Sequence, residues 1–194
     1  MKRSLLCLAL LAALPLAAVA APMSYSYVEA GWMKSDTGGD ADGWAANGSW
    51  AFHENFHVFG GYADQNVDDI YGSDFDQYQV GLGYHLSVNE RVDFVSRVAW
   101  RRADFGHSDA VLAMFPGAES SADGYTFEAG VRAAPAPMFE TEVALVYGDL
   151  DYDNGEFYVR LGAQVKFGQA WGVAGDVKLV GGDTQYFLGP RLSW

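Results

Sequence analysis

Three aspartates at alternate positions, Asp149, Asp151 and Asp153, could offer oxygen ligands to a calcium ion. Calcium loops of the EF-hand type use this spacing, with a glycine at position six and a bidentate acid at position twelve. Here the glycine, Gly155, comes one position late, and Arg160 stands at position twelve. The pattern therefore favours an acidic hairpin tip in solvent, with the three aspartates as candidate ligands for loosely bound divalent cations only.

The four histidines do not form a pattern that is typical of catalysis. His53, His57 and His85 fall in or near predicted turns at one end of the molecule, whereas His107 stands beside Ser108 in a predicted outer loop. A hydrolytic site needs a base whose side chain faces its nucleophile, and side chains of neighbouring residues rarely face each other. We therefore expect neither enzymatic activity nor a cofactor; a barrel enzyme that modifies lipid A is the catalytic alternative.

The elements that must position these residues are strands. From residue 23 onward, apolar and polar residues alternate with a period of two, which is typical of strands with one polar face. The alternation predicts ten strands, at 23–33, 43–52, 56–65, 75–86, 91–102, 123–133, 138–149, 156–167, 170–180 and 184–194. In 56–65 the pattern does not decide which face is apolar, and no stretch of the chain has the period of an amphipathic helix.

The predicted connections alternate between short and long. The short connections are 53–55, 87–90, 134–137 and 168–169, and the long ones are 34–42, 65–74, 103–122 and 150–155, with 181–183 as a short exception. Short turns at one end and long loops at the other are typical of transmembrane barrels. A soluble lipocalin-like barrel alternates in the same way, but aromatics at the strand ends of the apolar face favour the membrane.

The sequence thus predicts an all-β fold in one domain, residues 21–194. We expect a closed antiparallel up-and-down transmembrane β-barrel with ten strands, eight being the alternative count. Open edges with unpaired N–H groups are not tolerated in hydrocarbon, so the sheet must close.

The polar face of the predicted strands carries six acids and seven bases. These residues are Glu29, Asp93, Arg97, Arg101, Glu128, Arg132, Glu140, Glu142, Arg160, Lys166, Asp176, Lys178 and Arg191. Buried charges persist when they are paired, and small barrels fill their interior with side chains. We therefore expect an ion-pair network that plugs the lumen, with a narrow water-filled channel as the alternative.

The first twenty residues are typical of a secretory signal peptide. Lys2 and Arg3 precede the apolar run 5–16, and the small residues that follow predict cleavage after Ala20. The single cysteine, Cys7, lies within this segment, so the mature chain is expected to lack disulfides and thiolate sites.

The chain is acidic, with a formal net charge of −13 and a pI of about 4.4. This charge excludes a nucleic-acid binder, which needs Lys and Arg to displace counterions. Seventeen acids fall in the predicted outer loops and rims against only Lys34 and Arg102, which predicts a negative crown facing outward. The longest loop, 103–122, carries apolar residues at 111–115 that could bind a partner or cover the barrel mouth.

Eight segments of the chain resemble one family of proteins. They are SYSYVEAGW (24–32), DADGWAANGS (40–49), NFHVFGGY (55–62), QVGLGYH (79–85), DGYTFEAGVR (123–132), YVRLGAQVKF (158–167), WGVAGDVK (171–178) and LGPRLSW (188–194). In this order they resemble the Ax-type family of small outer-membrane proteins of plant-associated gammaproteobacteria, described as quorum-regulated and immunity-associated. The resemblance implies an outer-membrane location, an association with virulence and no catalytic site.

The C-terminus resembles the signal that the barrel assembly machinery reads. The chain ends on an aromatic residue, Trp194, with Gly189 at the position where the signal has a glycine, although Phe187 replaces the usual polar residue. We therefore expect a monomeric barrel of the bacterial cell surface, present also in outer-membrane vesicles, with a structural or interaction role. Its expected partners are membrane lipid, lipopolysaccharide, divalent cations and a host or cell-surface molecule.

Overall fold

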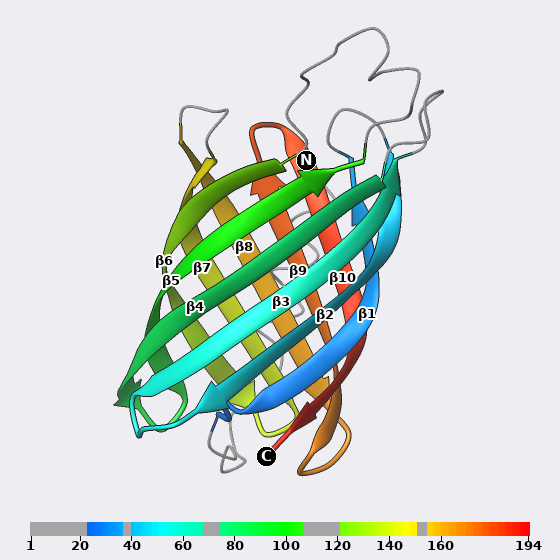
Figure 1. Cartoon of the computed structure of the whole chain (residues 1–194). Coiled ribbons are helices and arrows are strands. Elements are labelled where there is room, and N and C mark those ends of the chain that lie inside the picture. Colours follow the sequence, from blue (N-terminus) through cyan, green and yellow to red (C-terminus); the bar gives the residue numbers. More distant parts are fainter. Residues whose placement is uncertain (1–22, 37–39, 68–73, 107–120, 151–154) are drawn as a thin grey trace, which may run out of the picture.

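A computed structural model describes residues 23–36, 40–67, 74–106, 121–150 and 155–194, and ten strands form a closed antiparallel barrel within them (Figure 1). The strands are β1 (Tyr27–Ser35), β2 (Ala41–Ala51), β3 (Phe56–Val67), β4 (Asp74–Asn89), β5 (Val92–Phe105), β6 (Ser121–Ala136), β7 (Phe139–Leu150), β8 (Glu156–Lys166), β9 (Trp171–Val180) and β10 (Asp183–Ser193). Each strand pairs with its neighbours in sequence, and β1 pairs with β10 to close the sheet. The predicted fold class and the count of ten are confirmed, whereas the predicted signal peptide 1–20 lies outside the described residues.

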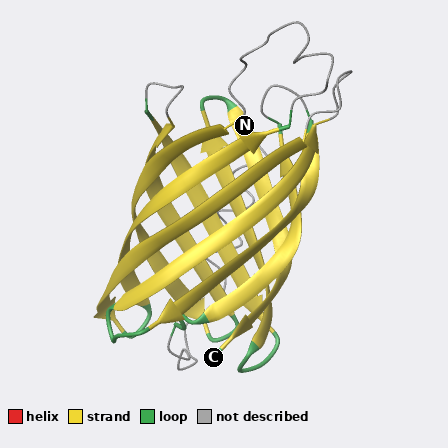
Figure 2. Ribbon diagram, in the orientation of Figure 1, coloured by secondary structure: helices red, strands yellow, loops and turns green. Residues whose placement is uncertain are grey.

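The connections separate by length between the two ends of the barrel (Figures 1 and 2). Residues 52–55, 90–91, 137–138 and 167–170 connect strands at the end where the C-terminus lies, and the strand ends that flank the longer connections lie at the opposite end. The exception, Gly181-Gly182, reverses the chain with both φ angles positive, at 57° and 108°, as tight hairpins with a primed turn require. No helix among the described residues is long and apolar enough to cross a bilayer.

Most predicted connections are shorter than the pattern indicated, because the strands extend into them. β5 and β6 take up both ends of the predicted loop 103–122, and β4 and β6 continue into the predicted turns 87–90 and 134–137. The two turns contain register shifts, at Ser87/Asn89 and at Ala133/Ala136. A bulge of this kind accommodates an extra residue, or a proline without an N–H, while the strand goes on pairing.

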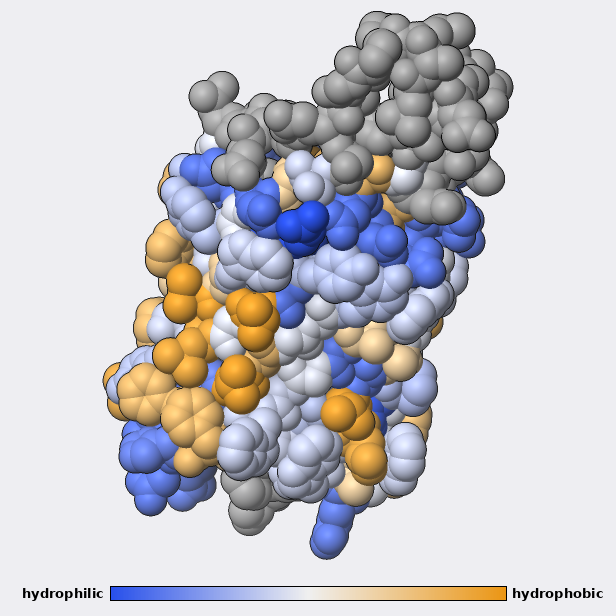
Figure 3. Space-filling view, in the orientation of Figure 1, coloured by the Kyte–Doolittle hydropathy of each residue, from blue (hydrophilic) through white to orange (hydrophobic). Residues whose placement is uncertain are grey.

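Apolar side chains gather in patches on the outward face between the two ends of the barrel (Figure 3). Exposed aromatic side chains lie on this face toward both ends. Exposed aromatics near the loop end are Trp32, Trp44, Tyr78, Trp100, Tyr125 and Phe157, and those near the C-terminal end are Trp50, Phe52, Phe94, Phe167, Trp171 and Trp194. Exposed valines and leucines lie between them, such as Val80, Leu82, Val98, Val143 and Leu161. An apolar band between two aromatic girdles is the exterior of a membrane-spanning barrel.

The facing of β3, which the sequence pattern did not decide, follows the same rule. Phe56 and Val58 are exposed on the outside, whereas His57 and Gln65 are buried in the lumen. β3 therefore contributes two polar groups to the interior.

The barrel closes where the backbones of β1 and β10 approach closely. A Cβ atom on Gly31 would overlap the carbonyl of Leu188, and one on Gly189 would overlap the carbonyl of Ala30. Only residues without a Cβ fit this close approach. The next residue, Pro190, has no N–H to donate across the seam.

Candidate functional site in the lumen

The inward side chains of the strands fill the lumen at three levels. All thirteen charged residues that were predicted to face inward lie on the inward face of their strands. We name the levels, from the C-terminal end toward the loop end, the inner cluster, the central network and the outer belt.

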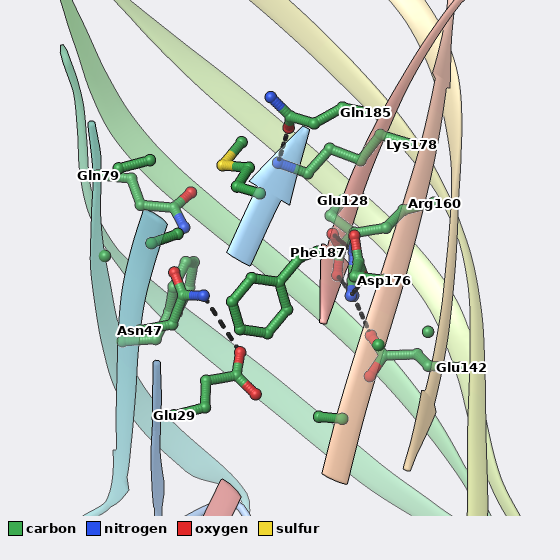
Figure 4. A pocket seen from close by; sticks show the side chains of 18 of the residues that line it. Glu29, Asn47, Gln79, Glu128, Glu142, Arg160, Asp176, Lys178, Gln185 and Phe187 are labelled. Carbon is green, nitrogen blue, oxygen red and sulfur yellow. Dashed lines mark hydrogen bonds and ion pairs between the residues drawn. The ribbon is translucent and has the colours of Figure 1, made fainter. Parts of the chain in front are cut away.

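The central network joins two arginines with three carboxylates from five strands, β5 to β9. Arg97 pairs with Glu128, which lies directly opposite it on β6, and with Glu142. Arg160 donates from Nε and Nη2 to Glu128 at 2.9 and 2.8 Å, from Nη1 to Asp176 at 2.8 Å, and also pairs with Glu142. Side-chain exposures of 11–20% place these charges largely out of solvent. Figure 4 shows Glu128, Asp176 and Glu142 gathered around Arg160.

A smaller ion pair lies on the opposite wall. Arg191 of β10 pairs with Glu29 of β1 at 2.6 Å and also donates to Gln164 at 3.2 Å. The amide of Asn47 donates to Glu29 at 3.1 Å, and the Arg191 guanidinium lies 4.2 Å from the centre of the Tyr27 ring. The pair therefore crosses the closing seam of the barrel.

The inner cluster is built around Tyr25, which precedes β1. Its hydroxyl donates to the buried carboxylate of Asp93 at 2.8 Å. Its ring stacks on His85, with centroids 3.7 Å apart, and on His57 at 5.0 Å. The Arg132 guanidinium lies over the same ring at 4.7 Å.

Arg132 extends the inner cluster toward β7 and β8. It donates twice to Glu140, with the Nη2 contact at 2.5 Å, and Lys166 pairs with the other oxygen of the same carboxylate. Arg132 also donates to the carbonyl of Ser24 at 3.0 Å, which ties the segment before β1 to the lumen. Side chains from seven parts of the chain, the segment before β1 and the strands β3 to β8, thus meet at this end.

The outer belt is a hydrogen-bonded series of polar side chains near the loop end. Its members are Ser35, Gln65, Gln77, Arg101, Lys178 and Gln185, from six strands. In order, the bonds join Arg101 to Gln77, Gln77 to Gln65, Gln65 to Ser35, Ser35 to Gln185 and Gln185 to Lys178, at 2.9–3.4 Å. Amide groups both donate and accept, so they can continue such a series.

A cavity of about 180 Å³ lies among these groups. The central network lines it, together with small residues of β2 and β3 such as Ala45, Gly61 and Ala63. Four members of the outer belt also line it, namely Gln77, Arg101, Lys178 and Gln185. In Figure 4 the ring of Phe187 projects into this space between Glu29 and Asp176.

The structure brings ten of the thirteen predicted lumen charges into ion pairs. Asp93, Arg101 and Lys178 instead have hydrogen bonds to the uncharged groups Tyr25, Gln77 and Gln185.

The sequence reasoning missed the participation of His57, His85 and the glutamines. Gly83 lies directly opposite His57 and leaves the space that its ring occupies, a signal that becomes readable once the pairing of β3 with β4 is known.

The candidate metal ligands do not form a site in the described part of the chain. Asp149 accepts a hydrogen bond from the Tyr125 hydroxyl at 3.1 Å, while Asp151 and Asp153 lie outside the described residues. Within the described ranges, no group of three or more His, Cys, Asp or Glu side chains could hold a metal ion. His107 and the apolar segment 111–115 also lie outside them.

The outward rim at the loop end is acidic where it is described. Asp64 lies directly opposite Asp76, and Asp76 lies opposite Asp104. Two bases lie at this described rim: Arg102 pairs with Asp104 and Asp123 at 2.8 and 3.7 Å, and Lys34 pairs with Asp40 at 3.1 Å. Like charges on opposite strands repel each other. A cation between these carboxylates relieves the repulsion, so the rim attracts cations.

No protein-family model matches the chain, and no curated protein sequence matches it. Among solved structures, the barrel is similar to Ail, the attachment invasion locus protein of Yersinia pestis, in complex with the heparin analogue sucrose octasulfate. The two are 17% identical, the match covers 86% of this chain and 97% of Ail, and the TM-score is 0.45. It is also similar to the KdgM porin (12% identity, 87% and 99% covered, TM-score 0.45) and to Neisserial surface protein A (12% identity, 88% and 98% covered, TM-score 0.42). No conclusion about function follows from likenesses of this size.

Proposed function

We propose that the chain is a monomeric outer-membrane barrel of the bacterial cell surface, with a structural or interaction role and a lumen closed by its own side chains. The observation that carries this proposal is the ion-paired interior inside an apolar exterior. Ion pairs of the central network link β5 to β9 across the lumen. Charges held in this way fix the shape of a barrel and leave little room for solutes to pass.

The acidic rim supports a role in contacts at the surface. Its carboxylates project outward at the loop end, at the level where lipopolysaccharide phosphates lie in an outer membrane. Divalent cations would bridge rim acids such as Asp64 and Asp76 to those phosphates, and the outer loops would meet a host or cell-surface partner. At low salt such a rim gathers cations and repels anions.

The sequence segments that resemble the Ax-type family support the same location. Under this proposal the signal peptide directs export, and the barrel assembly machinery recognises the C-terminal Trp194, which is exposed at the end of β10. Quorum-dependent expression and a contribution to virulence follow from the resemblance alone.

A narrow cation-favouring channel is the second candidate. The cavity beside Phe187 favours it, because polar groups line the cavity over much of the lumen. A lipid A-modifying enzyme is a third candidate, and the histidine and serine that it would use, His107 and Ser108, lie outside the described residues.

A clean deletion strain compared with its parent tests the proposal. We expect adhesion and biofilm formation to fall while permeability to small polar solutes stays unchanged. Wild-type protein should restore adhesion, whereas a variant with Asp64, Asp76 and Asp104 changed to Asn should restore it only in part. A loss of solute uptake with normal adhesion would contradict the proposal and favour the channel.

A further inference from the structure

Two cations of the lumen have no carboxylate partner among the described residues. Arg101 donates to the Gln77 carbonyl oxygen at 3.2 Å, and Lys178 donates to that of Gln185 at 2.9 Å. The other five inward arginines and lysines each form an ion pair with an acid. Positive charge is therefore in excess at the outer end of the lumen.

These two cations act on each other. Both line the same cavity, and Arg101 is the charged neighbour with the strongest electrostatic effect on Lys178. The carboxylates that act on Lys178, Asp176 and Glu128, belong to the central network, where three acids face two arginines, so the network offsets one of the two charges and leaves the other uncompensated. Two like charges in an environment of low dielectric are costly unless an anion compensates them.

The remaining walls of the cavity suit a hydroxylated solute. The side chains of Asn47, Gln79 and Gln185 face this space, as does the ring of Phe187 (Figure 4). Amides can donate to and accept from hydroxyl groups, and a ring can cover the apolar face of a small molecule. The cavity, at about 180 Å³, is many times the size that one water molecule needs.

We propose that Arg101 and Lys178 form an anion-binding subsite in the outer half of the lumen, for a small polyhydroxylated solute that carries a carboxylate. The planar guanidinium of Arg101 matches the two oxygens of a carboxylate, and the Lys178 ammonium supplies a second, more mobile charge. The subsite goes beyond the proposed function, because a solute can bind there without crossing the barrel.

The test is an isothermal calorimetric titration of the refolded mature protein in detergent micelles. Glucuronate is the ligand, and neutral glucose is the comparison. We expect glucuronate to bind at least about tenfold more tightly than glucose, since a hydrogen bond to a charged group contributes enough for such a ratio. Arg101→Gln and Lys178→Gln should each weaken glucuronate binding by about ten- to hundredfold. Neither variant should alter the weak binding of glucose by more than a small factor.

Arg102→Gln is the matched control, because it removes the same charge at the adjacent position but on the outside of the barrel. Folding of each variant is checked by heat-modifiable migration in gels; if Arg101→Gln does not fold, Lys178→Gln and Lys178→Met carry the test. Equal affinity for glucuronate and glucose, or full glucuronate binding by folded Lys178 variants, would overturn the proposal. So would an equal loss in the Arg102→Gln control.

Discussion

Replacing Arg160 with methionine removes the guanidinium that contacts three carboxylates of the central network. Glu128 and Glu142 would then share Arg97 as their remaining partner, and Asp176 would lose its ion pair. Breaking a buried pair by removing one partner costs about 3–5 kcal/mol, because the other charge stays buried without compensation. Arg160 is 17% exposed, so water reaches part of the site and we expect a loss near the lower end of that range.

The assay is equilibrium unfolding in urea of the barrel reconstituted in lipid vesicles, followed by tryptophan fluorescence. Arg102→Met is the control, since it removes an arginine that is 40% exposed and pairs with Asp104 at the rim. An exposed pair of that kind contributes about 0–1 kcal/mol. The difference between the two variants isolates the effect of burial.

A second variant separates charge from packing. Arg160→Met combined with Glu128→Gln removes one base and one acid together, and we expect it to recover at least about 1 kcal/mol relative to Arg160→Met alone, since residues of one network couple by about 0.5–3 kcal/mol. The reasoning is refuted if Arg160→Met loses no more stability than Arg102→Met. It is also refuted if the two substitutions are additive, so that Arg160→Met with Glu128→Gln is less stable than Arg160→Met by as much as Glu128→Gln alone destabilises the wild-type barrel.

Three further predictions concern the seam, the exterior and the inner cluster. Gly189→Val places a side chain where the β1 and β10 backbones meet, so the barrel of this variant should fail to close. Heat-modifiable migration in gels should then show little folded barrel. The control Gly168→Val lies in a turn where a Cβ meets nothing within 4 Å, and it should fold normally. Val80→Arg puts a charge in the lipid-facing band, where 52% of this residue is exposed, and should cost about 2–4 kcal/mol in vesicles; a loss under about 0.5 kcal/mol would place Val80 outside the hydrocarbon. Tyr25→Phe removes the hydroxyl that donates to the buried Asp93 carboxylate and should lower the free energy of unfolding by about 1–3 kcal/mol. The control Tyr186→Phe, on the outside, should change it by less than about 0.5 kcal/mol. Equal effects of the two variants would mean that the hydroxyl of Tyr25 does not stabilise the barrel.

The architecture and most of the facing could be predicted from the alternation of residue types. In β4, for example, Tyr78, Val80 and Leu82 face outward as their spacing predicts. β3 could not be assigned in this way, because Phe56 and Val58 on one face compete with Phe59 on the other. Glycines of β4 lie opposite the inward rings of β3 and leave space for them, which shows which face of β3 is inward. These glycines become informative only when the pairing of β3 with β4 is known.

The inward position of the site residues was predictable, but their partners were not. Whether Arg97 meets Glu128 depends on the register between β5 and β6, and a long loop separates these strands in sequence. The turns gave no help, because bulges at Ser87/Asn89 and Ala133/Ala136 let strands continue through residues that were expected to form turns. If a strand shifted by one residue against its neighbour, its inward side chains would move to the outer face and lose their partners.

Single-channel recording in planar bilayers tests the closed lumen most directly. The purified barrel, inserted at neutral pH beside a control porin under the same conditions, is expected to give no resolved conductance steps. The variant Arg160→Met, which loosens the central network, should give intermittent small steps if it inserts. Steady conductance steps from the wild-type barrel would contradict the account and establish a channel.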